Sequence, residues 1–86
     1  MYEIGFDKDW FKYWKKIPQN LHFQLLNKMK ELKEEKTFRH LKHGLPYFVL
    51  ESGQYRVCFK EKDNLRTLYF VGDHKEYEKW YSSILE

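Results

Sequence analysis

GQYRVCFKEKDNLRTLYFVGDHKEY, residues 53–77, carries the pattern that decides the fold. Apolar residues recur with a period of two over residues 55–61 and again over residues 65–71, which predicts two strands. The polar residues 62–64 between them predict a tight turn, so the two strands are expected to pair antiparallel.

The flanking segments predict one element each. In chain order these are a strand at residues 2–6, a helix over residues 7–17 carrying Trp10, Phe11 and Trp14, a helix beginning near Pro18, a strand at residues 47–50 and an amphipathic helix at residues 73–86. The basic, histidine-rich residues 37–46 read as a loop. The order β-α-α-β-β-β-α predicts an α+β fold with an N-terminal strand, a two-helix hairpin, a three-stranded antiparallel meander and a C-terminal helix, the helices packing on a twisted antiparallel sheet.

Length and composition set the class of protein. A chain of 86 residues is too short to divide, so residues 1–86 are expected to form a single domain. The single cysteine, Cys58, excludes an intrachain disulfide. The first residues do not form a signal peptide, and no stretch is apolar enough to span a membrane, so we expect a cytoplasmic protein with no membrane contact. The net charge of +3 is compatible with an anionic partner.

Strand alternation predicts which side chains share a face of the sheet. Centring the turn on Asp63 sets three pairs opposite one another: Arg56 with Phe70, Cys58 with Leu68, and Lys60 with Arg66. This face then mixes apolar groups with three cations. The other face carries Phe48, Leu50, Tyr55, Val57, Phe59, Tyr69 and Val71, and predicts the core.

Arg56 is the informative member of the mixed face, since an arginine at the centre of a sheet needs a partner for its guanidinium. One interpretation is a structural ion pair with Glu51, Asp73 or Glu76. The other is an anion site, because the fixed donors of a guanidinium match a phosphate. Lys60 and Arg66 lie near the end of the hairpin, so they could also be charged side chains exposed to water at the edge of the sheet.

Several polar residues that could serve in a functional site also fit a purely structural role. Asp73 and Glu76 have the spacing of a capping box. Tyr77 opens the apolar stripe of the last helix, so it fits packing as well as catalysis. His40 and His43 lie in a loop with no further ligand at a suitable spacing, which argues against a zinc site. No metal or other cofactor is expected.

At this point the chain resembles the RelE/ParE superfamily of toxins from type II toxin–antitoxin pairs. The family pattern is a Gly-x-Tyr-Arg strand, a hairpin, an apolar strand ending in Gly, and then His-x-x-Tyr. The matching residues are Gly53, Tyr55, Arg56, Val57, Gly72, His74 and Tyr77, and HLKHGLPYFVL resembles the family's segment before the second strand. The resemblance covers nearly the whole chain.

The resemblance implies a toxin that a cognate antitoxin neutralises. In the RelE branch this means a ribosome-dependent messenger-RNA endoribonuclease, which needs no metal because the ribose 2′-OH attacks the adjacent phosphate. Arg56 would stabilise the phosphate, His74 would act as base or acid, and Tyr77 would stack on a base or assist proton transfer. Lys60, Arg66 and Lys75 are auxiliary cations for substrate binding.

Other functions stay open because the chain departs from the family pattern. Tyr47 and Val49 are uncharged where ribonuclease relatives often carry Lys or Arg, and Asp73 adds negative charge beside the site. One alternative is a ParE-like, non-enzymatic inhibitor of DNA gyrase. Another is a degenerate, non-toxic binding module with the same fold.

Overall fold

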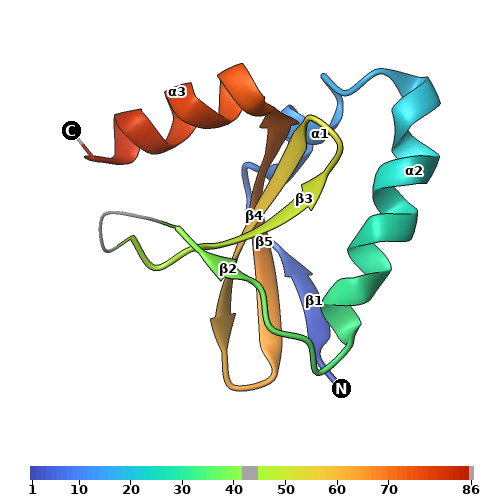
Figure 1. Cartoon of the computed structure of the whole chain (residues 1–86), viewed down its shortest axis with the longest axis vertical. Coiled ribbons are helices and arrows are strands. Elements are labelled where there is room, and N and C mark those ends of the chain that lie inside the picture. The colour runs from blue at the N-terminus through green and yellow to red at the C-terminus, as the bar shows by residue number, and fades with distance from the viewer. Residues whose placement is uncertain (42–44, 86) are drawn as a thin grey trace.

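Five strands form one sheet in the order β1-β5-β4-β3-β2, and three α-helices pack around it (Figure 1). The computed structural model describes residues 1–41 and 45–85. The strands are β1 (Glu3–Phe6), β2 (Arg39–His40), β3 (Phe48–Ser52), β4 (Tyr55–Lys62) and β5 (Leu65–Asp73). The helices are α1 (Trp10–Trp14), α2 (Gln19–Met29), the 3₁₀ helix η1 (Lys30–Lys33) and α3 (His74–Leu85). The predicted α+β fold is confirmed.

The strands β3, β4 and β5 form the predicted antiparallel meander, and β1 pairs with β5 in parallel. Gly53 turns the chain between β3 and β4 with a φ of 59°, a left-handed conformation that glycine adopts without a steric penalty. The short strand β2 was expected to be loop. It pairs with β3 through two residues only, too few for a period-two pattern to appear in the sequence.

The pairing of β4 with β5 differs from the prediction in two ways. The turn has two residues rather than three, which sets Glu61 opposite Arg66 and moves Arg66 to the other face of the sheet. A β-bulge then leaves Tyr69 without a partner residue on β4. From Phe70 onward the side chains of β5 therefore lie on the faces of the sheet that were predicted for them. As a result Arg56 lies opposite Gly72, not opposite Phe70.

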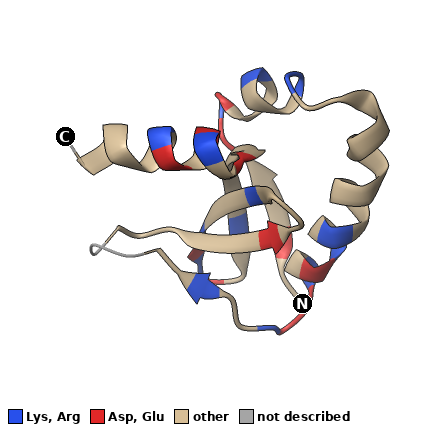
Figure 2. Cartoon of the chain, turned by 45° about the horizontal axis from the view of Figure 1, so that its top comes forward, with Lys and Arg blue, Asp and Glu red and all other residues tan. Residues whose placement is uncertain are grey.

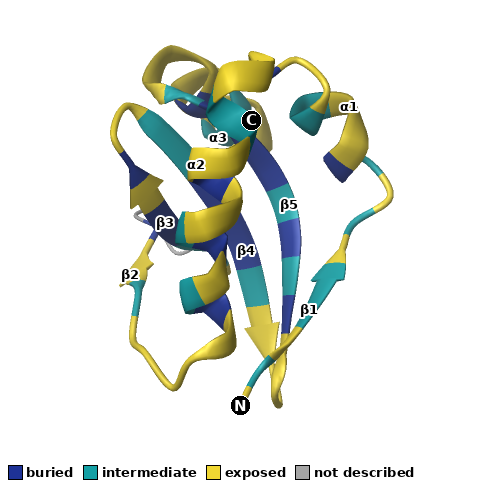
Figure 3. Ribbon diagram, turned by 90° about the vertical axis from the view of Figure 1, so that its right-hand side faces the viewer, coloured by how far each residue is buried: buried dark blue, intermediate teal, exposed yellow. Residues whose placement is uncertain are grey.

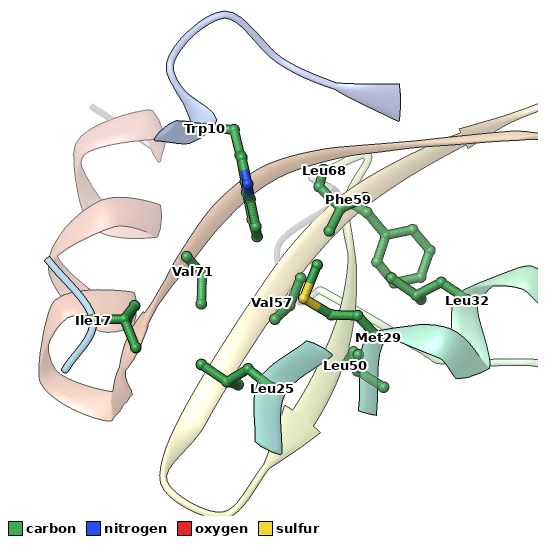
Figure 4. Packing of buried hydrophobic residues seen from close by; sticks show 10 residues of the cluster. All are labelled: Trp10, Ile17, Leu25, Met29, Leu32, Leu50, Val57, Phe59, Leu68 and Val71. Atoms are coloured by element: carbon green, nitrogen blue, oxygen red, sulfur yellow. The ribbon is translucent and has the colours of Figure 1, made fainter. Parts of the chain in front are cut away.

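Two apolar clusters lie on the two faces of the sheet. Figure 3 shows buried segments of β4 and β5 beneath α2. The cluster on that face joins the helices to the strands (Figure 4), and its buried members are Trp10, Ile17, Leu25, Met29, Leu32, Leu50, Val57, Phe59, Leu68 and Val71. The cluster on the opposite face lies under α3 and is built from Leu41, Val49, Cys58, Phe70 and Tyr77. Leu68 and Tyr69 therefore exchange their predicted faces, since Tyr69 packs against Tyr47 at a ring distance of 5.4 Å.

The start of α3 is fixed by two local features. The Asp73 N–H donates to Glu76 Oε1 at 3.0 Å, and the Glu76 N–H donates to Asp73 Oδ1 at 2.9 Å, so the capping box is confirmed. Gly72 precedes it in a crowded place, because a Cβ there would lie 2.6 Å from Phe70 Cζ. No helix in the described part of the chain is long and apolar enough to cross a membrane.

Candidate functional site

A pocket of about 330 Å³ lies between β2 and the first half of α3. Both elements lie on the side of the molecule away from α2 (Figure 1). The lining combines one guanidinium, two imidazoles, two phenols, a carboxylate and a leucine: Arg39, His40, His74, Tyr77, Tyr81, Glu78 and Leu41. Two of the predicted catalytic residues, His74 and Tyr77, are thus brought together at one cavity.

His74 opens α3 and pairs with a carboxylate one turn later. Its Nε2 lies 2.9 Å from Glu78 Oε1, and both side chains are more than half exposed. Residues four apart on a helix are neighbours, so the pair follows from the sequence spacing. In neutral histidine an Nε2–H donating to Glu78 leaves Nδ1 as an acceptor, which is the form that a general base needs.

Tyr77 forms the buried floor of the pocket. Only 8 % of the residue is exposed, and its ring centroid lies 5.1 Å from that of Tyr81. Burial raises the pKa of the Tyr77 hydroxyl, with Cys58 adding to the shift and the charges of Arg39 and Arg56 opposing it. The hydroxyl is therefore protonated at neutral pH and suited to donating a proton or a hydrogen bond. A residue this buried offers little ring surface for stacking on a base.

Arg56 lies on β4 beside the pocket and is engaged from two sides. Its Nη1 donates to the carbonyl oxygens of Gly53 and Tyr55, each at 3.1 Å. Its Nε lies 3.2 Å from Glu51 Oε2, and 15 % of its side chain is exposed. The ion pair with Glu51, one of the two interpretations of Arg56, is thus present in the structure.

Arg39 extends this cluster from β2. Its Nη2 lies 3.5 Å from the same Glu51 Oε2, so one carboxylate oxygen stands between two guanidinium groups. The sequence interpretation did not select Arg39, which stood in a segment expected to be loop. The basic, histidine-rich composition of residues 37–46 was the sequence feature that could have pointed to Arg39. For Glu78, which was not selected either, the feature was its position four residues after His74.

Lys60 and Lys75 do not line the pocket. The Lys60 ammonium lies 5.1 Å from the ring centroid of Tyr47 and 5.0 Å from that of Tyr69, where it makes cation–π contacts. Lys75 is exposed on α3. Basic and acidic segments are interspersed along α3 and around the sheet, rather than separated onto two sides (Figure 2).

Arg66 was expected among the substrate-binding cations, and this prediction is wrong. The residue is 2 % exposed on the face opposite Arg56. Its guanidinium donates to Glu61 Oε1 at 2.8 Å and to the carbonyl oxygens of Leu32, Glu34 and Lys36 at 2.8–3.0 Å. It also lies 3.7 Å from the centroid of the Tyr2 ring. Arg66 therefore joins the end of η1 to the sheet.

Cys58 is fully buried, and burial raises the pKa of its thiol, so it is a core residue and not a nucleophile. Within residues 1–41 and 45–85, no three His, Cys, Asp or Glu side chains are grouped closely enough to hold a metal ion. His43 lies outside the described residues.

Comparison with known proteins assigns the fold. No model of a protein family matches the chain, and no curated protein matches it in sequence. Among solved structures, a chain of the RelB–RelE antitoxin–toxin complex from Methanococcus jannaschii is 16% identical with a TM-score of 0.71, over 90% of this chain and 98% of that one. An Escherichia coli RelE mutant in complex with an antitoxin RelB peptide is 23% identical with a TM-score of 0.69, over 91% and 92%. YafQ from E. coli is 11% identical with a TM-score of 0.63, over 90% and 98%. The chain therefore has the RelE fold.

Proposed function

We propose that this chain is the toxin of a type II toxin–antitoxin pair and acts as a metal-independent, ribosome-dependent messenger-RNA endoribonuclease. The fold shared with RelE supports the class of protein. The observation that carries the proposed chemistry is the pocket in which His74 and Tyr77 face Arg39, with Arg56 on the neighbouring strand.

The proposed reaction is attack of a ribose 2′-OH on the adjacent phosphate. The RNA supplies its own nucleophile, so the protein must provide a base, an acid and positive charge for the phosphorane. His74, held at Nε2 by Glu78, takes the 2′-OH proton at Nδ1. Tyr77 donates to the leaving 5′-oxygen, for which its protonated hydroxyl is suited. Arg56 neutralises the phosphate oxygens. The products are a 2′,3′-cyclic phosphate and a 5′-hydroxyl end.

An antitoxin is the proposed protein partner. Two of the solved structures with this fold are complexes with RelB. The surface that we propose for the antitoxin is an apolar groove of about 820 Å³ between the edge strand β1 and α2, lined also by Lys30 and Lys33. Exposed apolar side chains line it, including Phe6 and Leu26. An amphipathic segment with acidic residues would cover these groups and pair with the lysines.

Induced expression in a growing bacterial culture tests this function. Toeprinting on translating ribosomes is expected to show cuts at fixed positions within codons, and these cuts are expected to disappear in Arg56→Ala and His74→Ala. Lys62→Ala, which changes an exposed lysine at the end of β4 outside the pocket, is the control and keeps the cuts. Intact messages together with supercoiling defects would identify a gyrase inhibitor instead.

A second candidate function is a binding module that has lost cleavage. The observation that favours it is that acidic side chains of the same chain already engage two of the proposed catalytic residues: Glu51 pairs with Arg56, and Glu78 contacts His74. Under this function, strong expression leaves growth and messages unchanged, while the chain still binds its protein partner.

A further inference from the structure

We propose that Arg39 and Arg56 form one phosphate-binding pair and that Glu51 is its internal counterion, which an incoming phosphodiester displaces. The class of ligand, a phosphodiester, rests on the proposed function. Arg39 becomes a further substrate-binding residue. Glu51 then has an inhibitory role.

The geometry places a single carboxylate oxygen where a phosphate oxygen would bind. Glu51 Oε2 lies 3.2 Å from Arg56 Nε and 3.5 Å from Arg39 Nη2. The backbone fixes this arrangement, because Glu51 is paired directly with Arg56 across β3 and β4. Arg39 enters from β2, whose pairing sets it opposite Val49 on the same strand as Glu51.

The Glu51 carboxylate leaves one N–H donor of the arginine pair without a hydrogen bond. Arg56 Nε is buried, and the contact with Glu51 lacks the alignment of a hydrogen bond, so this donor has no hydrogen-bond partner. A guanidinium binds best when two of its N–H groups meet two oxygens of one anion. A phosphodiester offers two non-bridging oxygens, and so it can reach both arginines with a better geometry than one carboxylate oxygen.

The side chains that must move are free to do so. The Glu51 side chain is 46 % exposed and that of Arg39 is 56 % exposed. Glu51 can therefore rotate into water without disturbing the strand. Arg56 stays in place, because its Nη1 is held by the carbonyl oxygens of Gly53 and Tyr55. Arg39 and the buried Tyr77 both line the adjacent pocket, so a phosphate held here would lie at the mouth of the proposed catalytic site.

Titration of the isolated protein with inorganic phosphate, and with a trideoxynucleotide that lacks the attacking 2′-OH, tests the proposal. Glu51→Gln keeps the shape and removes the charge, and it is expected to bind both probes about five- to tenfold more tightly than the native chain. Glu34→Gln removes an equal charge outside the cluster and is expected to stay within about twofold of native binding.

Arg39→Ala decides whether the two arginines act as a pair. It is expected to weaken binding of both probes about fivefold or more and to abolish the gain produced by Glu51→Gln in the double variant. Arg39 is exposed, so this variant is expected to fold, as circular dichroism would show. Unchanged affinity in Glu51→Gln, or a gain that survives Arg39→Ala, would overturn the proposal and leave Glu51 a structural partner of Arg56. These readouts need neither ribosome nor cleavage, so failure of the ribonuclease function is seen separately, in the toeprinting experiment.

Discussion

Arg56 and Arg66 lie on opposite faces of the sheet, ten residues apart on two neighbouring strands. Arg56 shares its face with Cys58 and the α3 side of the molecule. Arg66 packs near Phe59 in the cluster beneath α2, with its guanidinium 5.6 Å from the centroid of that ring. One arginine therefore belongs to the candidate site and the other to the framework that supports it.

Replacing Arg66 is expected to destabilise the fold strongly. Arg66→Met removes the donor for Glu61 and for three backbone carbonyls, leaving these acceptors unpaired, and should cost about 3 kcal/mol of unfolding free energy. Arg56→Met should cost about 1 kcal/mol or less, because Glu51 is half exposed and can turn to water. Urea unfolding of both variants measures the difference. Equal losses would contradict the two roles.

Gly72 is expected to tolerate no side chain. In Gly72→Ala the new methyl group would lie 2.6 Å from Phe70 Cζ and 3.0 Å from Glu76 Cβ, so the Phe70 ring must move out of its packed position and the start of α3 is crowded. We expect a loss of about 2 kcal/mol in thermal or urea unfolding. Gly5→Ala is the matched control, because its methyl group meets only ordinary contacts and stability should change by less than about 0.5 kcal/mol. A similar loss in both variants would point to backbone effects instead.

The capping box is expected to hold the His74–Tyr77 turn in place. Asp73→Ala removes the acceptor for the Glu76 N–H, so the first turn of α3 should open more often and the chain should lose about 1 kcal/mol. Hydrogen exchange of the amides in α3 measures the opening. Glu76→Gln keeps an acceptor oxygen for the Asp73 N–H and should leave exchange nearly unchanged. Uniform protection in Asp73→Ala would show that packing alone fixes the helix.

Stability is expected to fall as the pH rises above about 8.5, the ordinary pKa of a cysteine thiol. Burial raises the pKa of Cys58 in the folded chain, so the folded thiol keeps a proton that the unfolded thiol loses. The unfolded state then binds fewer protons, and unfolding becomes more favourable by up to about 1.4 kcal/mol per pH unit. Below that pH the contribution is complete and constant.

Cys58→Ala isolates this contribution, since alanine has nothing to titrate. Urea unfolding between pH 7.5 and 9.5 should give a steeper decline for the native chain than for the variant. Above pH 10 both curves should fall more steeply, because burial also raises the pKa of Tyr47 and Tyr77. The native chain should stay the steeper of the two, because its folded thiol still keeps a proton there. Parallel curves below pH 9.5 would contradict the buried, neutral thiol.

The sequence predicted the elements of the fold better than their register. Alternating and helical periodicities are strong over β4, β5 and α3, and these elements were predicted within a few residues. The faces of β5 were predicted less well. A two-residue turn in place of three, followed by a bulge at Tyr69, moves Arg66 and Leu68 across the sheet. Neither feature can be read from the periodicity of apolar residues, because the turn length and the bulge both depend on the register in which β4 and β5 pair.

The candidate site was predictable in part for a similar reason. His74 and Tyr77 stand one helical turn apart, so their meeting follows from local spacing. Arg39 reaches the site only through the two-residue pairing of β2 with β3, a long-range contact that composition cannot reveal. Of the two interpretations of Arg56, the ion pair with Glu51 is present in the structure, and anion binding stays a proposal with a test.

The most direct test of the central claim is to map the RNA ends left on a defined message by purified ribosomes and the purified chain. We predict cuts that require the ribosome, persist in the presence of a chelator, and leave 2′,3′-cyclic phosphate and 5′-hydroxyl ends, with a loss of at least about 100-fold in rate in His74→Ala. An intact message at equimolar chain and ribosome, or a cleavage rate that is unchanged in His74→Ala, would contradict the account.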